Sequence, residues 1–108
     1  MIRIIIFLGI LLSPLLVNAS NKSLSNDLAV EAIKIAEKDM TSAVFLIQQS
    51  VVADPKNAKA WAIAGKIYLL NEDITSAERF YKKAKALGPF LKDVKDLEFL
   101  IKNKKKEE

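Results

Sequence analysis

The side chains available for chemistry in this 108-residue chain are mainly lysines, carboxylates and serines, because it contains neither histidine nor cysteine. Histidine is the commonest general base and metal ligand, and cysteine is the most reactive nucleophile. The serines form no Ser-x-x-Lys or Gly-x-Ser-x-Gly motif, and the three glycines form no phosphate-binding loop. The acidic pair Glu72-Asp73 precedes a predicted helix, where capping accounts for it. We therefore predict no catalytic, metal-binding or cofactor-binding residue and no enzymatic activity.

Two lysines are spaced for binding rather than for catalysis. Lys59 and Lys66 are seven residues apart, which is two turns of a helix, so both side chains project from one face. Two cations in that arrangement could bind an acidic side chain or the C-terminal carboxylate of a partner. An ordinary solvated helix face would have the same spacing, and both interpretations stay open at the level of the sequence.

The first nineteen residues have the composition of a signal peptide. Arg3 precedes an apolar run from Ile4 to Leu12, and Val17-Asn18-Ala19 supplies small or short side chains where a signal peptidase recognises them. We predict a signal peptide over residues 1–19, and a protein exported to the bacterial periplasm or secreted. The alternative is an uncleaved helix over residues 2–17 that anchors the protein in a membrane.

The rest of the chain has the pattern of helices separated by turns. Residues 20–25 are polar and predict a flexible tether. From Asn26, which is placed to cap the first helix, apolar residues recur at helical spacing. No segment alternates apolar and polar residues over the length of a strand. We therefore predict an all-α domain over residues 26–102, followed by a charged tail over residues 103–108.

Two parts of the helical domain repeat each other. Shifting the sequence by 34 residues aligns the segment Asp39–Ala43 with Asp73–Ala77, four of the five residues being identical. The same shift aligns Pro55 with Pro89. In each segment the aspartate is placed to cap the helix that follows. A run of identities at one offset that also aligns two helix stops indicates an internal repeat.

The second unit carries a motif made of small, aromatic and proline residues. Its members are Trp61, Gly65, Tyr68, Ala77, Tyr81, Ala84 and Pro89. A 34-residue helix-turn-helix unit with these residue types in this order resembles the tetratricopeptide repeat (TPR) family, with Ala64 where the family usually has leucine. Gly65 and Ala77 are expected on facing helices whose backbones approach closely, with the aromatic side chains packed around them.

The resemblance implies a fold and a function. The fold is a short α-solenoid of TPR-like helix-turn-helix hairpins: a degenerate repeat over residues 26–56, a well-matched repeat over residues 57–90 and a C-terminal capping helix over residues 91–102. In the family, the first helices of successive repeats line a concave groove that holds a peptide or a partner's helix. The groove-facing positions here are Lys59, Ala62, Lys66, Leu69, Leu70, Leu28, Ala32 and Ile35. We therefore expect a non-enzymatic scaffold or adaptor that binds a protein or peptide outside the cytoplasm.

Self-association as a structural module is a second possibility. Stacks of such repeats generally need about three units, and this chain has two hairpins and one further helix. The apolar residues of that helix can pack inward as a cap or pair with another subunit in a homodimer; they are Leu91, Val94, Leu97, Leu100 and Ile101. Nucleic acid is a poor candidate partner, because the net charge is only +4 and basic residues are interleaved with acidic ones.

Overall fold

The computed structural model describes residues 20–107, which form an all-α domain of five helices. They are α2 (Lys22–Ile35), α3 (Met40–Ala53), α4 (Ala58–Leu70), α5 (Ile74–Leu87) and α6 (Lys92–Glu107). The prediction of an all-α domain is confirmed. The predicted signal peptide, and its alternative as a membrane anchor, lie outside the described residues. Within residues 20–107, no helix has the length and apolar character needed to cross a membrane.

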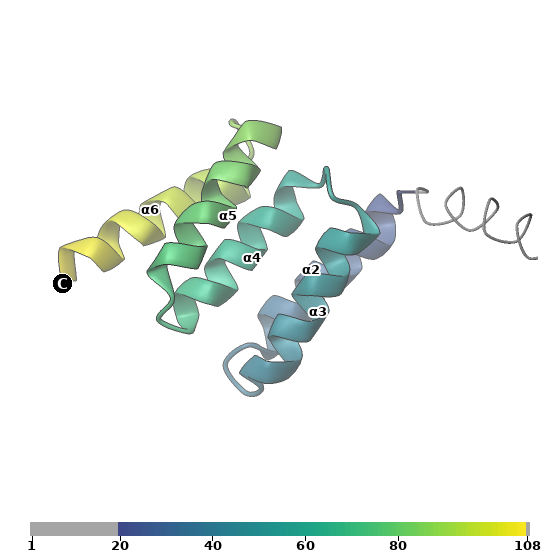
Figure 1. Cartoon of the computed structure of the whole chain (residues 1–108), viewed down its shortest axis with the longest axis horizontal. Helices are drawn as coiled ribbons and strands as arrows, with labels where there is room; N and C mark the ends of the chain where they lie inside the picture. The colour runs from purple at the N-terminus through teal and green to yellow at the C-terminus, as the bar shows by residue number, and fades with distance from the viewer. Residues whose placement is uncertain (1–19, 108) are drawn as a thin grey trace, which may run out of the picture.

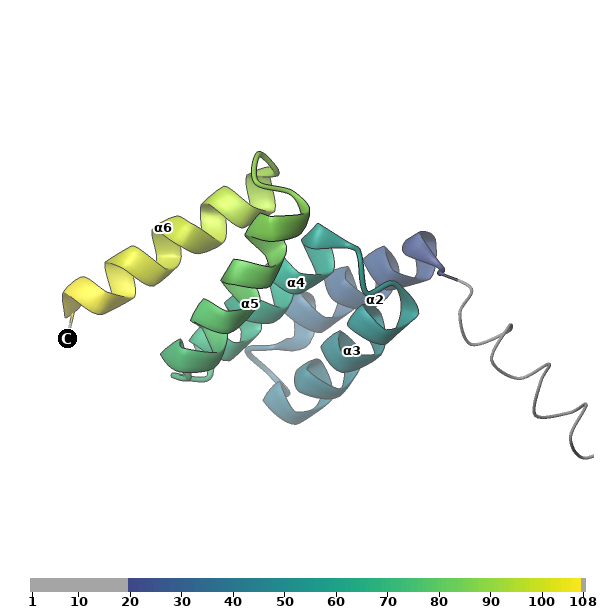
Figure 2. The same cartoon turned by 45° about the horizontal axis from the view of Figure 1, so that its top comes forward.

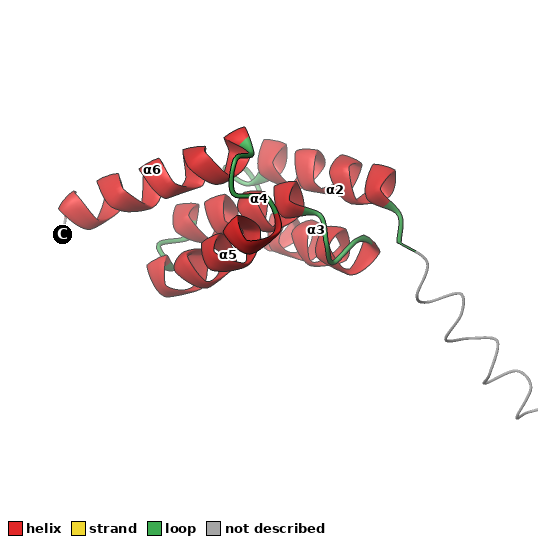
Figure 3. Cartoon of the chain, turned by 90° about the horizontal axis from the view of Figure 1, so that it is seen from above, coloured by secondary structure: helices red, strands yellow, loops and turns green. Residues whose placement is uncertain are grey.

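The helices pack as consecutive antiparallel pairs (Figure 1). α2 pairs with α3, and α4 pairs with α5. α4 is the centre of the domain, because it contacts all four other helices. Seen from above, α2 and α6 lie on one side of the molecule, and α3 and α5 lie on the other (Figure 3). Both α2 and α6 pack against α4, and side chains of all three helices line one shared hollow, so we describe α2, α4 and α6 as one layer.

Equivalent aspartates begin the second helix of each pair. Asp39 Oδ1 accepts a hydrogen bond from the Ser42 backbone N–H at 3.0 Å, and Asp73 Oδ1 accepts the same bond from Ser76 at 3.0 Å. Side-chain and backbone hydrogen bonds from these serines lower the pKa of both carboxyls, because they stabilise the charged form. The 34-residue offset of the sequence is therefore repeated in the geometry of the caps.

The prediction of a flexible tether over residues 20–25 is wrong, and so is the prediction that Asn26 caps the first helix. α2 begins at Lys22, and the cap is Asn21, whose Oδ1 accepts a hydrogen bond from the Leu24 N–H at 2.9 Å. The Asn21 N–H in turn donates to the carbonyl at the end of α3, that of Ala53, at 2.9 Å. This short polar segment is therefore fixed at both of its ends.

Two buried serines hold the first pair of helices together. The Ser25 hydroxyl donates to the Ser50 carbonyl at 2.8 Å, and the Ser50 hydroxyl donates to the Ser25 carbonyl at 2.6 Å. Both residues are completely buried. The Asn57 side-chain amide adds donations to Ser25 Oγ at 3.0 Å and to Asn26 Oδ1 at 2.7 Å. Serine at these positions lets α2 and α3 approach closely, because its side chain is small and its hydroxyl is satisfied by the facing backbone.

The charged tail predicted over residues 103–108 is helical as far as Glu107. Lys104 Nζ lies 2.9 Å from a carboxylate oxygen of Glu72, and Lys105 Nζ lies 2.9 Å from one of Glu78. These ion pairs link the last turns of α6 to the turn between α4 and α5 and to the first half of α5. α6 is therefore longer than the capping helix that ends at residue 102 in the prediction.

The nearest neighbour of Gly65 is a side chain of α6. A Cβ added at Gly65 would overlap Cδ2 of Leu97, so the space beside this glycine is filled by a side chain of the last helix. Val94, Leu97 and Ile101 of α6 are all buried against α4 and α5. These three residues pack inward, which removes them from the dimer interface considered above.

The aromatic residues of the motif pack around a residue that the motif does not include. The rings of Trp61 and Tyr68 lie 5.8 and 4.9 Å from the ring of Phe80, measured between centroids. Ala77 and Ala84 are completely buried on α5, and Pro89 is exposed in the turn before α6. The Tyr81 hydroxyl donates to the Glu98 carboxylate across the α5–α6 contact. The alanines and the aromatic residues therefore belong to the packing of the helices, whereas Pro89 does not.

Candidate functional site

Three residues predicted on the partner-binding face are covered by the protein itself. Ala32 and Ala62 are completely buried, and Leu69 is 8% exposed. Ala62 lies beneath Val94 of α6 and beside Ala84 of α5. Small side chains at these positions let the helices of the layer close upon one another. Ala32 and Ala62 therefore leave no surface for a partner to contact, whereas Leu69 keeps a small exposed area at the floor of the face.

Leu28 and Ile35, the other two α2 residues predicted on the partner-binding face, lie away from that face. Ile35 is half-buried and packs against the core shared by α2, α3 and α4. Leu28 is half-buried and lines a hollow between α2 and α3, on the side away from α4. Neither residue lines a hollow of the α2, α4 and α6 layer. The accessible part of the predicted face is thus reduced to Lys59, Lys66 and Leu70.

Leu70 and Lys66 line what we call the apolar hollow, near the C-terminal ends of α2 and α4. Leu70 is 51% exposed, and Leu100 of α6 is 41% exposed. The hollow measures about 460 Å³, and its lining consists of Ile33, Lys66, Leu69, Leu70, Glu72, Leu100, Asn103, Lys104 and Glu107. Leucine and isoleucine side chains from three helices give it an apolar interior with a charged rim.

The lysines at this rim are paired with carboxylates of the same chain. Lys66 Nζ lies 3.4 Å from Asp93 Oδ1, and Lys104 is paired with Glu72. Asp93 is 27 residues away from Lys66 in sequence, so no helical spacing could have indicated the pair. The prediction that Lys66 serves with Lys59 as a cation for a partner's carboxylate is therefore weakened, since Lys66 is already matched.

Lys59 lines a different hollow, at the N-terminal ends of α2 and α4, which we call the basic hollow. Three lysines, Lys22, Lys56 and Lys59, line this space of about 360 Å³, and its lining includes no carboxylate. None of the three makes an ion pair within residues 20–107. The sequence indicated Lys59 alone, because Lys22 lay in the supposed tether and Lys56 in a turn.

The basic and apolar hollows lie along the same face of the layer. On α2, Asn26 lines the basic hollow and Ile33 the apolar one; on α4, Lys59 and Lys66 divide in the same way. Each pair is seven residues apart, which is two helical turns or about 10 Å. The face therefore offers cationic groups at one end and apolar side chains at the other.

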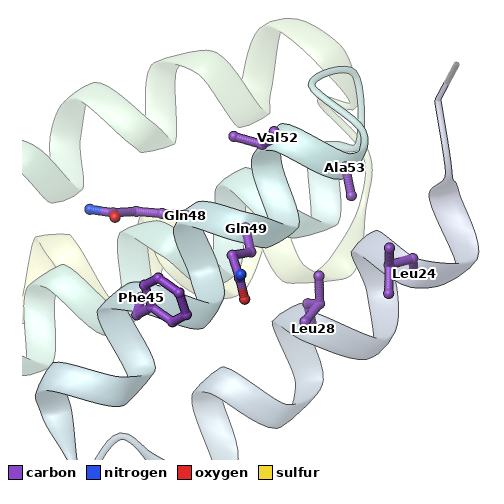
Figure 4. Close-up of a pocket in the computed structure, with 7 residues that line it drawn as sticks. All are labelled: Leu24, Leu28, Phe45, Gln48, Gln49, Val52 and Ala53. Atoms are coloured by element: carbon purple, nitrogen blue, oxygen red, sulfur yellow. The ribbon is translucent and has the colours of Figure 1, made fainter. Parts of the chain in front are cut away.

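A third hollow, which the sequence did not indicate, lies between α2 and α3 on their outward side (Figure 4). We call it the outer hollow. It measures about 560 Å³ and is lined by Leu24, Leu28, Phe45, Gln48, Gln49, Val52 and Ala53. Phe45 is 60% exposed and Val52 is 77% exposed. The sequence carries a signal for this hollow, because Phe45, Gln48, Gln49 and Val52 share a helix face opposite to the buried Ala43, Ile47 and Ser50.

No family model, curated protein or solved structure matches this chain. The case for a function therefore depends on the three hollows and on the charges around them.

The titratable groups with displaced pKa values are held by structural pairings. The carboxyls of Asp96 and Glu98 have lowered pKa values, because Lys92 and Tyr81 respectively donate hydrogen bonds to them. Burial, together with the hydrogen bond to Glu98, raises the pKa of Tyr81 to about 12. Within residues 20–107, no group of side chains is arranged to hold a metal ion. None of these shifted groups lines the basic or the apolar hollow.

Proposed function

We propose that this chain is a non-enzymatic protein-binding module of TPR-like hairpins that acts outside the cytoplasm. The sequence motif, the repeated aspartate caps and the antiparallel helix pairs support this assignment. The alternative of a TPR-like domain displayed from a membrane rests on the N-terminal sequence alone. Mass spectrometry of the native protein distinguishes them, because an uncleaved chain retains residues 1–19 and a processed chain begins at Ser20.

The observation that carries the proposal is the arrangement of the basic and apolar hollows along one face. An extended peptide advances about 3.3 Å per residue, so the separation of about 10 Å corresponds to roughly three residues. The ligand would place an acidic group in the basic hollow and an apolar side chain, about three residues away, in the apolar hollow. The acidic group is either a side chain or the C-terminal carboxylate of the partner.

Lys56 and Lys59 are the cations that we assign to this ligand. Both are free of ion pairs within the described residues, so a carboxylate would gain charge-assisted hydrogen bonds without displacing an existing partner. Lys66 differs, because a ligand there would have to compete with Asp93. Lys59 and Lys66, which have equivalent positions two turns apart on α4, are therefore assigned different roles.

The test uses synthetic peptides in which the distance between an acidic and an apolar residue is varied, and binding is measured by fluorescence anisotropy. We expect the tightest binding at a separation of about three residues. The double variant Lys56→Glu/Lys59→Glu should weaken binding at least tenfold, and so should Leu70→Asp. Amidation of the peptide C-terminus distinguishes a terminal carboxylate from an acidic side chain.

A charge-matched control for the double variant is Lys38→Glu/Lys82→Glu. Both of these lysines are exposed, and neither lines the basic or the apolar hollow. The control should bind as the unaltered chain does. Equal binding by the Lys56→Glu/Lys59→Glu variant and by its control would contradict the proposal.

A further inference from the structure

The outward side of α6 carries a regular row of lysines interrupted by one phenylalanine. Its members are Lys92, Lys95, Phe99, Lys102 and Lys106, spaced by three, four, three and four residues. This spacing places them on one face of the helix, opposite to the buried Val94, Leu97 and Ile101. All five are exposed, and Phe99 is 63% exposed. Lys92 and Lys102 form solvent-exposed pairs with Asp96 and Glu98 of the same helix, whereas Lys95 and Lys106 make no ion pair within residues 20–107. We call this row the Lys–Phe stripe.

The outer hollow has the complementary properties. Its interior is formed by uncharged side chains, among them Leu24, Phe45 and Val52. On α2, the exposed carboxylates of Asp27 and Glu31 follow Leu24 by three and seven residues, so they lie on the same helix face beside the hollow. Neither of them makes an ion pair within residues 20–107. The hollow thus combines space for an apolar side chain with unmatched negative charge.

The stripe and the hollow lie at opposite ends of the domain. Figure 2 shows α6 at one end and the α2–α3 pair at the other, with α4 and α5 between them. They therefore cannot meet within one molecule. A contact between two different surfaces of identical chains is heterologous, and it leaves one free stripe and one free hollow for further chains.

We propose that the Lys–Phe stripe of one copy docks on the outer hollow of a second copy. Phe99 enters the hollow between Leu24, Phe45 and Val52, and lysines on either side of it face Asp27 and Glu31. This contact uses none of the residues that line the basic and apolar hollows. Head-to-tail assembly is therefore independent of the peptide binding proposed above, and either can fail while the other holds.

The first experiment measures the molecular mass as a function of protein concentration by sedimentation velocity. The sample is the chain as it is isolated from the cells that produce it. The unaltered chain should associate progressively, and Val52→Asp and Phe99→Asp should each remain monomeric. Both side chains are mostly exposed, so neither substitution should alter the fold, which circular dichroism checks. An unaltered chain that stays monomeric up to millimolar concentration would overturn the proposal.

Mixing the two variants separates this contact from a symmetric one. Val52→Asp retains an intact stripe and Phe99→Asp retains an intact hollow, so an equimolar mixture should form a dimer that contains one copy of each. This dimer cannot extend further, because its remaining stripe and hollow are the substituted ones. If the unaltered chain associates but the mixture of the two variants stays monomeric, the contact is not head-to-tail. Association that Val52→Asp abolishes and Phe99→Asp leaves intact would also contradict the proposal, because the hollow would then hold another occupant.

The charges provide a second test. Lys95→Glu/Lys102→Glu should weaken association at least tenfold, and combining it with Asp27→Lys/Glu31→Lys should restore the loss. The control Lys38→Glu/Lys83→Glu makes the same change of charge at two exposed lysines that line neither the outer hollow nor the hollow beside Lys102, and it should leave association unchanged. Equal effects of the two double variants would show that only net charge matters, and would overturn the assigned pairing.

Discussion

Leu97 of α6 occupies the space beside Gly65 of α4, so closely that a Cβ on the glycine would overlap Cδ2 of the leucine. Leu97 is completely buried and has little room to move aside. We expect Gly65→Leu to lower the free energy of unfolding by about 1–3 kcal/mol through overpacking. Urea denaturation measures the loss.

A compensating variant shows whether Leu97 is the cause of that loss. Leu97→Ala alone should cost about 2–5 kcal/mol, because it leaves a cavity. Combined with Gly65→Leu, the total cost should be clearly less than the sum of the two single costs, since the new side chain enters the vacated space. Strict additivity would show that the two positions do not share this space.

The buried exchange between Ser25 and Ser50 predicts a second non-additive pair. Removing either hydroxyl deprives a buried group of its partner, and we expect Ser25→Ala or Ser50→Ala to cost about 1–3 kcal/mol of stability each. The double variant should cost less than the sum, because both partners are then apolar. Thermal or urea unfolding of the unaltered chain, the two single variants and the double variant gives the coupling free energy between the two serines. A matched control is Ser23→Ala, at an exposed position of α2, which should leave stability unchanged.

How far these features could be predicted depends on how local their cause is. Asp39 and Asp73 were identified as caps because a cap and its helix are adjacent in sequence. The burial of Ala32 and Ala62 depends on how closely α2, α4 and α6 approach, which no single helix determines. The Lys66–Asp93 pair joins residues on different helices, so no spacing along one helix indicates it. For the same reason the spacing of Lys59 and Lys66 along α4 does not reveal that the two side chains line different hollows.

The segment before Asn26 was misread for a chemical reason. Asn21 and Ser25 are typical of flexible linkers, but the same residue types cap helices and satisfy buried backbone groups. Which role they take depends on whether a partner is within reach, and here the partners are Ala53 and Ser50, far along the chain. Composition therefore indicated a linker where tertiary contacts form a helix.

The Tyr81–Glu98 hydrogen bond predicts a loss of stability at alkaline pH. The pKa of Tyr81 is raised to about 12 in the folded protein, against about 10 for an unperturbed tyrosine. The folded state therefore holds this proton more tightly, so the contribution to stability is complete below pH about 10 and is lost as the pH rises toward the folded pKa. For Glu98 the pKa is lowered, so its contribution is present above pH about 4 and is lost as the pH falls further.

The alkaline part can be measured by unfolding the chain in urea at a series of pH values between neutrality and about 12. Tyr81→Phe should be less stable at neutral pH and should lose less stability than the unaltered chain as the pH rises. The matched control, Tyr68→Phe, removes a phenol hydroxyl from α4 and leaves the Tyr81–Glu98 pair in place. A Tyr81→Phe chain with the same alkaline loss as the unaltered chain would contradict this assignment.

The start of α2 allows the two interpretations of residues 20–25 to be separated by truncation. A tether contributes nothing to folding, whereas the observed segment supplies the Asn21 cap and the buried hydroxyl of Ser25. Each buried hydrogen bond contributes about 1 kcal/mol, and its loss strands a partner in Ser50. We expect a chain that begins at Asn26 to be less stable by at least about 2 kcal/mol than one that begins at Ser20.

Deleting residues 103–108 removes a segment of equal length whose ion pairs are at the surface, and exposed pairs contribute only about 0–1 kcal/mol each. The N-terminal deletion should therefore lower the urea midpoint more than the C-terminal one, and the opposite order would mean that the contacts of Asn21 and Ser25 do not stabilise the fold.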